Sequence, residues 1–420
     1  MTLVKSIAMY ASGTVVASYL MFRAYIAIKY PFWTKQPVFF PWNFTYWFRA
    51  PFVINEGTVE PTKYTNFVDI SFSSLTPGDS AEIGELTQLV NKQYLQTEDC
   101  KYNPSKDVMS AMFAGHSHDC YVSLYKAAIK VNHAKFKEGN KKEIPKGPAT
   151  FSQEVVGTMT TRPVKLRIKN KEMPAYYVDL LCVHADFRKK RIANQIIETH
   201  HYYQRKNNPK IKVSLFKREG MLMRSMPLCE FPTLCFKLST LMTSVGDLIY
   251  KPLKREKVVH MTTQCDYILA DYVSITDQYQ DCLITTGLPN LMELIKKRHL
   301  NVIVSMIDNV PAYAYVFREN QCLYKGEKSI TLIATLLCSS NGATNFNAMY
   351  RGGIQAIRKA ATRSRSGIVC IEMLGLTCKW GTYMDIATSG NEEIPPSPTG
   401  YYLYNYACLP LAPQEVTVLL

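Results

Sequence analysis

A short basic loop between a strand-like run and a helix-like run is the feature of this sequence best suited to chemistry. β-forming residues end near Val183, and a helical pattern begins near Ile192. Four cations lie between them: Arg188, Lys189, Lys190 and Arg191. Because backbone N–H groups at a helix start and basic side chains both attract anions, the loop predicts a pyrophosphate-binding site. Taken alone, such a loop is also typical of a solvated surface.

Other catalytic and metal-binding signatures are missing. The loop has none of the spaced glycines of a P-loop or a dinucleotide fingerprint, which disfavours a nucleoside triphosphate or NAD as the ligand. No group of Cys and His residues has zinc-ligand spacing, so we expect no metal. The 12 cysteines are scattered along the chain, and we interpret them as thiols in a reducing compartment.

The composition is that of an ordinary globular protein. Of 420 residues, 47% are hydrophobic and 20% are charged, which excludes a disordered, collagenous or coiled-coil chain. The length predicts two or three units of ordinary domain size. The formal charge of +15 favours an anionic partner, such as a polyphosphate cofactor or anionic lipid. The cations are dispersed apart from a lysine-rich stretch, Lys126 to Lys146, which is interpreted as a solvated loop or hairpin tip, so we expect no nucleic-acid partner.

The N-terminus holds the stretch most suited to a membrane. SIAMYASGTVVASYLMF lies between Lys5 and Arg23, and AYIAI follows before Lys29. A bilayer span needs about 20 apolar residues, which residues 7–28 supply if Arg23 snorkels. We expect a membrane anchor, with a cleaved signal peptide or a buried helix as the alternatives. The cations after this stretch outweigh Lys5, which predicts that the rest of the protein is cytoplasmic and membrane-associated.

Strand and helix patterns alternate through the remainder of the chain. Residues 30–54 are rich in aromatics and prolines, which predicts an extended segment. An amphipathic helix with Ile83, Leu86, Leu89 and Val90 on one face is predicted next. A hairpin over residues 155–184 and a helix after the basic loop follow. The second half repeats the mixture, with a helix from Thr344 to Ala361, a loop IPPSPTG, and the final strands YYLYNY and EVTVLL. The fold class is therefore α/β, or α+β with a mixed sheet.

Three segments carry a resemblance to a known family. YPFWTKQPV, from Tyr30 to Val38, resembles the entry motif of glycylpeptide N-myristoyltransferases. YVDLLCVHADFRKKRIANQI is similar to that family's strand, basic loop and helix, an arrangement that also resembles the acyl-CoA loop of the GNAT-type N-acyltransferase fold. GYYLYNYACLPLAPQEVTVLL resembles the family's C-terminal segment. The three occur in the family's order, and the region that they bracket runs from Tyr30 to Leu420.

The resemblance implies an architecture of two GNAT-like halves in one saddle-shaped fold. We expect an anchor over residues 1–29, which is not part of the family pattern, and an aromatic segment over 30–54. The acyl-CoA half would span 55–240. The half that carries the peptide groove and the C-terminal carboxylate would span 241–420. The implied activity is transfer of a tetradecanoyl group from myristoyl-CoA, the co-substrate, to the N-terminal glycine of protein substrates, without a metal.

The resemblance also implies roles for particular residues. Leu180 and Leu181 take the positions whose backbone amides form the oxyanion hole, and Leu420 supplies the carboxylate that acts as base. The cofactor-binding positions are Tyr30, Phe32, Trp33, Arg188, Lys189, Lys190, Arg191, Ile192 and Ala193. The substrate-binding positions are Glu98, Asp99, Tyr102, Gly220 and Tyr404.

These roles are chemically consistent. A thioester reacts with a neutral amine without a covalent enzyme intermediate, so the absence of a Ser-His-Asp or Cys-His signature is no objection. Backbone N–H groups in an oxyanion hole contribute about 3 kcal/mol each. A solvated carboxylate, of pKa about 3.5, is a weak base for an ammonium of pKa about 8, but burial shifts the two values toward each other. EVTVLL is apolar enough to be buried, although such a tail is also typical of a plain edge strand.

The sequence departs from the family on the acceptor side. Asp179 takes a position usually held by Asn. The family's Thr-Ala-Gly stretch is replaced by Arg218, Glu219 and Gly220, and no Trp-His-Arg follows Cys229. Two alternatives therefore stay open. One is a GNAT-type acyltransferase that uses acyl-CoA with another amine, such as a lysine side chain or a non-protein amine. The other is a non-catalytic acyl-CoA binding protein.

Overall fold

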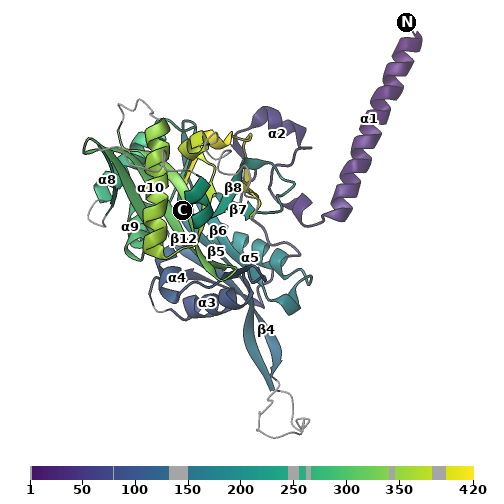
Figure 1. The fold of residues 1–420 in the computed structure, drawn as a ribbon. Coiled ribbons are helices and arrows are strands. Elements are labelled where there is room, and N and C mark those ends of the chain that lie inside the picture. Colours follow the sequence, from purple (N-terminus) through teal and green to yellow (C-terminus); the bar gives the residue numbers. More distant parts are fainter. Residues whose placement is uncertain are drawn as a thin grey trace.

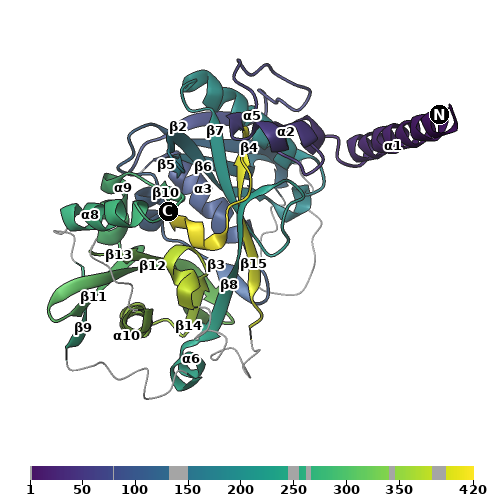
Figure 2. The same cartoon turned by 90° about the horizontal axis from the view of Figure 1, so that it is seen from above.

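One large mixed β-sheet runs through the body of the protein (Figures 1 and 2). The computed structural model describes residues 2–78, 80–131, 150–244, 255–261, 266–339, 346–380 and 394–420. Within them, 15 strands form the sheet, with the main path β17-β10-β5-β6-β7-β15-β8-β14-β13-β12-β11-β9. β4 pairs with β5 and β2, and β3 pairs with β12. The strands are β2 (Ile70–Leu75), β3 (Cys100–Tyr102), β4 (Cys120–Val131), β5 (Thr150–Ile168), β6 (Lys171–Val183), β7 (Val213–Glu219), β8 (Pro227–Lys237), β9 (Glu256–His260), β10 (Cys282–Thr285), β11 (Leu300–Ile307), β12 (Val310–Tyr324), β13 (Glu327–Leu337), β14 (Ile368–Glu372), β15 (Ser397–Tyr404) and β17 (Val416–Leu419).

Helices cover this sheet, and a short pair of strands, β1 (Phe52–Val53) and β16 (Tyr406–Ala407), lies apart from it. The helices are α1 (Thr2–Lys29), α2 (Phe44–Arg49), α3 (Ala81–Gln93), α4 (Lys106–Met112), α5 (Ile192–Asn207), α6 (Leu238–Ser244), α8 (Asp266–Asp277), α9 (Leu288–Lys296) and α10 (Phe346–Ser364). α3 and α5 contact β5, whereas α10 contacts β11, β12 and β13. The mixed α/β class predicted from the sequence is confirmed, and the division into halves at residue 240 stays a prediction.

Several predicted elements are confirmed in place. Residues 155–184 form the hairpin of β5 and β6, which turns at Lys169, a residue in the left-handed conformation with φ of 51°. In α3 the Ser80 hydroxyl accepts a hydrogen bond from the Ile83 N–H at 3.2 Å, which caps the helix start. Ile83 and Leu86 are fully buried, as the amphipathic pattern predicts.

The C-terminal strand β17 is inserted into the protein rather than lying on its surface. It pairs in parallel with β10, which places Leu419 opposite Thr285, and β10 pairs antiparallel with β5. β17 ends the main path of the sheet, yet Leu420 is only 3% exposed. Leu419 packs in one apolar cluster and Leu420 in another. The strand therefore separates two parts of the core.

Three sequence-based predictions need correction. Residues 30–54 were expected to be extended, but the six-residue helix α2 forms between Pro41 and Pro51, in a stretch of nine residues without proline. Cys100 and Cys322 form a disulfide between β3 and β12, so not every cysteine is a free thiol. The loop predicted over residues 394–400 is shorter, because β15 begins at Ser397. Most of the lysine-rich stretch, and the predicted start of the helix at Thr344, lie outside the described residues.

α1 projects from the body (Figure 1) and is long enough to cross a membrane. Met9–Lys29 forms a candidate span of mean hydropathy 1.3, of which 6% is buried. A helix of this kind near an N-terminus also fits a signal sequence. The low burial excludes the alternative of a core helix.

Candidate active site

The basic loop lies between β6 and α5, as predicted. Lys189 and Arg191 both adopt left-handed backbone conformations, with φ of 64° and 63°. Arg188 holds the loop in place, because its guanidinium donates to the backbone oxygens of Val183, at 3.1 Å, and Gln93, at 3.3 Å. The Lys190 ammonium lies 4.5 Å from the centre of the Phe187 ring. Within the described residues, Lys189 and Arg191 have no such partner and are the cations most available to an anionic ligand.

α5 starts close to the sheet because of a glycine. A Cβ on Gly157 of β5 would lie 2.7 Å from the Ile196 Cδ1 atom, so a side chain there would push the helix away. Ile192 is buried and Ala193 is half-buried at the first turn of α5. Their side chains face the protein, and their contribution to an anion site is therefore through the backbone N–H groups of the helix start.

The predicted oxyanion hole coincides with a β-bulge. The register of β5 and β6 shifts so that Thr160 faces Asp179 while Thr158 faces Cys182, which leaves Leu180 and Leu181 opposite a single residue. Leu180 has a φ of 53°. Its N–H donates to the Asp179 carboxylate at 2.8 Å. An acyl carbonyl would have to displace this carboxylate to use the Leu180 N–H.

β6 and β7 separate at the same point. They pair in parallel only from Ala175 to Val178 on β6, although β6 continues to Val183 and β7 to Glu219. Beyond Val178 the two strands are no longer hydrogen-bonded to each other. The bulge therefore lies where β6 and β7 diverge, and we name this divergence, beyond Val178 on β6 and Phe216 on β7, the opening.

The C-terminus points toward this opening. Leu419 is level with Thr285 of β10, which is level with Lys165 of β5. Because β5 runs antiparallel to β10, the chain end continues toward lower residue numbers of β5, in the direction of Thr160 and the bulge. The Leu420 side chain packs in a cluster that includes Val164 and Tyr177. The predicted base and the predicted oxyanion hole thus lie in the same region.

A buried network of charges borders the opening on the β7 side. The Lys217 ammonium is paired with the carboxylates of Glu219, at 2.6 Å, and Glu372, at 2.8 Å. Arg318 lies 3.1 Å from the same Glu372 oxygen. The Glu372 side chain is 1% exposed and that of Lys217 is 9% exposed. The network therefore lies mostly in the protein interior, with Arg318 22% exposed and Glu219 57% exposed at its solvent side.

The two carboxylates keep Lys217 charged. Burial alone would lower the pKa of the Lys217 ammonium, but Glu372 and Glu219 outweigh burial and raise it above its ordinary value. In return, Lys217 lowers the pKa of Glu219. Neither Lys217 nor Glu219 is therefore a proton acceptor near neutral pH.

Tyrosines surround Asp179. Burial, followed by the Asp179 charge, raises the pKa of both Tyr102 and Tyr177, so both rings stay protonated. The predicted substrate-binding residue Tyr102 is thus close enough to Asp179 for the carboxylate charge to raise the pKa of its hydroxyl. His116 is near the chain end: its ring contacts the Thr286 hydroxyl at 3.4 Å, and the Thr286 N–H donates to the Leu419 oxygen. Burial lowers the pKa of His116 to about 4, which leaves this ring neutral.

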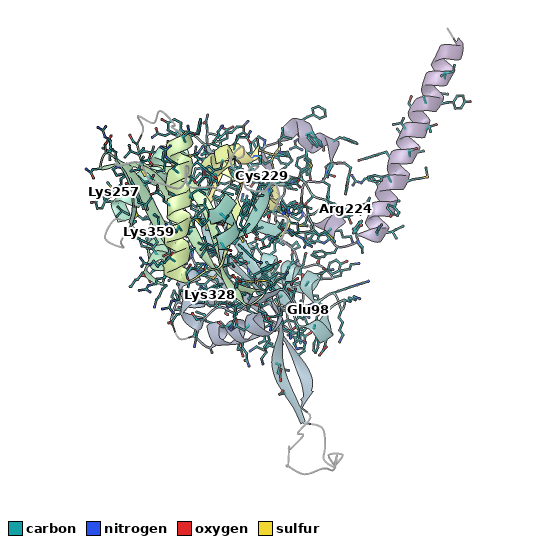
Figure 3. The ribbon with its side chains drawn as sticks, viewed as in Figure 1. Glu98, Arg224, Cys229, Lys257, Lys328 and Lys359 are labelled. Carbon is teal, nitrogen blue, oxygen red and sulfur yellow. A yellow bond between two sulfur atoms is a disulfide. The ribbon has the colours of Figure 1, made fainter. Side chains whose placement is uncertain are left out.

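The predicted N-terminal entry segment packs beside α5. Phe32 is 3% exposed and makes edge contacts with Trp33 and Tyr64. The ring of Tyr30 lies 5.0 Å from the Arg224 guanidinium (Figure 3). The side chain of Gln36, also in this segment, donates to Glu198 of α5 at 2.9 Å.

The other predicted substrate-binding residues are dispersed. Glu98 and Asp99 are exposed, and Asp99 lies 3.9 Å from the Lys325 ammonium (Figure 3 labels Glu98). Gly220, with a φ of 77°, is exposed at the end of β7. Tyr404 packs away from Leu420, in another cluster, and its hydroxyl donates to Gln36. The structure does not bring these four residues to the bulge.

The sequence reasoning missed the charges that line the opening: Arg162, Lys217, Arg318 and Glu372. A signal for Arg162 was present, because it shares the alternation of Val164, Leu166 and Ile168, all of which point inward. A cation at an inward strand position indicates a functional or paired charge. Among the described residues, no group of three or more His, Cys, Asp or Glu side chains could hold a metal ion.

Comparisons with known proteins agree with this fold. The family model described as myristoyl-CoA:protein N-myristoyltransferase, N-terminal domain, matches residues 139–229. No curated protein matches the chain by sequence. A Saccharomyces cerevisiae N-myristoyltransferase with bound myristoyl-CoA is 13% identical, with a TM-score of 0.64 over 92% of this chain and 90% of that one. A second structure of the yeast enzyme, with myristoyl-CoA and inhibitors, is 14% identical, with a TM-score of 0.63 over 91% of each chain. The resemblance to the glycylpeptide N-myristoyltransferase family is confirmed.

Proposed function

We propose that this chain, which carries the N-terminal domain and the fold of the N-myristoyltransferase family, transfers a tetradecanoyl group from myristoyl-CoA to the N-terminal glycine of proteins. The observation that carries the proposal is the convergence of three features on one opening. These are the bulge at Leu180 and Leu181, the basic loop that starts α5, and the buried chain end at Leu420.

The reaction needs no group beyond the substrates and this chain. The carboxylate of Leu420 accepts a proton from the glycine ammonium, and the neutral amine attacks the thioester carbon. The carbonyl oxygen gains negative charge and is stabilised by the N–H groups at the bulge, once Asp179 has released the Leu180 N–H. The C–N bond forms in this step, and the C–S bond breaks as the oxyanion collapses to the amide carbonyl. CoA leaves as a thiolate, which takes up the second proton that the nitrogen loses.

The test is a mass measurement on acceptor peptides. The full chain in mild detergent is incubated with myristoyl-CoA and with three peptides: one that begins with Gly, one that begins with Ala, and an N-acetylated one that contains Lys. We expect the mass of a C14 acyl group to be added to the Gly peptide alone. Addition to the Lys peptide would instead support another amine acceptor. Bound myristoyl-CoA without transfer to any peptide would favour the non-catalytic binding protein.

The contacts of α1 support a membrane-associated location, and the cations that follow its apolar stretch support a cytoplasmic body. All described side chains of α1 from Ile7 to Ser18 are exposed. Tyr19 is the first that is half-buried, and its ring centre lies 5.9 Å from that of Phe44 on α2. Phe22 and Trp42 make a similar contact at 5.6 Å. The body of the protein thus begins beside Tyr19, well before the end of α1 at Lys29.

These contacts support a membrane boundary near Tyr19 and α2. Phe48 of α2 is 90% exposed and Trp47 is 41% exposed. The Trp47 indole N–H is satisfied by the Pro41 oxygen at 2.9 Å, so its ring can enter an apolar layer without losing a hydrogen bond. Seventeen residues without charge, Ser6 to Phe22, precede Arg23. At 1.5 Å per residue they span about 25 Å, close to the thickness of a bilayer core.

The full chain in lipid vesicles tests this location. Vesicles that contain brominated phosphatidylcholine are expected to quench Trp47 emission, and the quenching should fall in W47F. A tryptophan placed at Val310, which is 59% exposed on β12, serves as a control that should not be quenched. Failure of the chain to float with the vesicles would exclude the anchor. Flotation with equal quenching in wild type and W47F would exclude insertion of α2.

A further inference from the structure

Among the residues that the structure describes, Arg162 of β5 is a buried cation without an anionic partner. It is 5% exposed, and its Nε atom has no hydrogen-bond partner. Its guanidinium carbon lies 5.2 Å from the centre of the Tyr177 ring. Among the described residues, no carboxylate lies within ion-pair distance, and this includes Asp179 and the chain end at Leu420. The other buried cations near the opening, Lys217 and Arg318, both have carboxylate partners.

Strand register places Arg162 inside the proposed active site. Arg162 faces Tyr177 across β5 and β6, and two residues further on Thr160 faces Asp179 at the bulge. Side chains two apart on a strand share a face, so Arg162 lies on the face of Val164. That face packs against Leu420. Arg162 therefore lies between the chain end and the bulge, along the line where the acceptor amine must sit.

An unpaired guanidinium in such a place is unfavourable for folding alone. Removing an ion from water without a counter-charge is strongly destabilising, and buried charges in proteins are normally paired. A cation–π contact with one tyrosine offsets only part of this loss. The arrangement therefore points to an anion that is present when the protein works.

We propose that Arg162 binds an anionic group, a carboxylate, on the acceptor next to the amine that is acylated. The myristoyl chain and its thioester carry no charge, and the phosphates of CoA are accounted for by the basic loop outside this face. The acceptor is the remaining substrate. A planar carboxylate matches the fork of a guanidinium and can accept two hydrogen bonds from it.

This inference rests on the proposed acyl transfer and narrows its acceptor. Glycine-initiated acceptors with Asp or Glu close behind the glycine are preferred to those with Asn or Gln. A small amine that carries a carboxylate, such as free glycine, fits the same chemistry, and its uncharged counterpart glycinamide does not.

The decisive experiment compares acidic and amide peptides that are otherwise identical. Glycine-initiated peptides with Asp or Asn, and with Glu or Gln, at the second and third positions are assayed with the full chain, and kcat and KM are measured separately. We expect kcat/KM to favour the acidic peptide of the best pair by about 10- to 100-fold. R162Q should remove the preference, and R162K should restore part of it. Equal kcat/KM for every acid and amide pair would overturn the proposal, as would a preference that survives in R162Q.

A control variant and a binding assay distinguish failure of the Arg162 anion site from failure of the proposed acyl transfer. R167Q is the matched control, because Arg167 lies on the same strand but is paired with Asp277. It should leave the preference unchanged. Binding of the labelled peptides to protein saturated with a non-hydrolysable thioether analogue of myristoyl-CoA is measured by fluorescence anisotropy. Tighter binding of the acidic peptides without any turnover would retain Arg162 as the anion site and reject the transferase. Turnover without discrimination in either assay would reject the anion site alone.

Discussion

A chain extended by a few residues beyond Leu420 is expected to lose transfer activity by about 100-fold or more, because the carboxylate that accepts the proton moves out of the site. Each added residue displaces the charge by about 3.3 Å along the strand direction. The chain end has no room to absorb the extension, since Leu420 is 3% exposed and packs with Val164 and Tyr177. Deletion of Leu420 has the same result, because it draws the carboxylate back toward Leu419. The measurement is the rate of C14 addition to the Gly peptide.

The control for this prediction keeps the carboxylate in place. L420M retains an apolar side chain of similar volume at the chain end and should transfer at close to the wild-type rate. Binding of myristoyl-CoA, measured in parallel, should be unchanged in the extended chain because the basic loop and α5 are untouched. Wild-type turnover by the extended chain would show that another group is the base.

Replacement of Glu372 by alanine is expected to lower stability by about 3 to 5 kcal/mol, because it leaves Lys217 and Arg318 buried without their common partner. Glu372 is 1% exposed and accepts from both cations, at 2.8 and 3.1 Å. A decrease in the midpoint of urea unfolding for E372A is the measurement.

Glu219, in the same network of charges, provides the control variant for E372A. Glu219 pairs with Lys217 at 2.6 Å but is 57% exposed, so E219A should lose no more than about 1 kcal/mol. A double variant, K217M with E372Q, removes one charge of each sign and should regain part of the loss in E372A. Equal losses of stability in E219A and E372A would contradict the explanation that the burial of Glu372 makes its loss more destabilising.

Local patterns in the sequence were sufficient for many elements of the fold. Ile83 and Leu86 recur at helical spacing and are fully buried in α3, and the Ser80 cap lies where the capping pattern predicts it. The hairpin of β5 and β6 follows from alternation and a polar turn. These features depend on interactions within a few residues, and so they can be read without knowledge of the remaining chain.

The residues on the acyl-CoA side of the site are also close together in the sequence. The basic loop, the bulge and the start of α5 lie within about fifteen consecutive residues, from Asp179 to Ala193, and this stretch belongs to one of the three segments that carry the family resemblance. The sequence could therefore predict the oxyanion positions and the phosphate-binding loop together. It did not show that the Asp179 side chain accepts from the Leu180 N–H, since that depends on the left-handed backbone at the bulge.

The sequence by itself determined the mixed α/β class, the apolar N-terminal helix, the basic loop and the apolar chain end. Each of these features depends on the residue types within continuous segments of the chain. Only the tertiary structure decided what lies around the acceptor. Lys217 and Glu372 are far apart in the chain and meet because β7 and β14 share one sheet, whereas Arg162 on β5 of that sheet meets no carboxylate among the described residues. Whether a buried charge is paired depends on distances across that sheet. Strand order and register set those distances, and no local pattern encodes them.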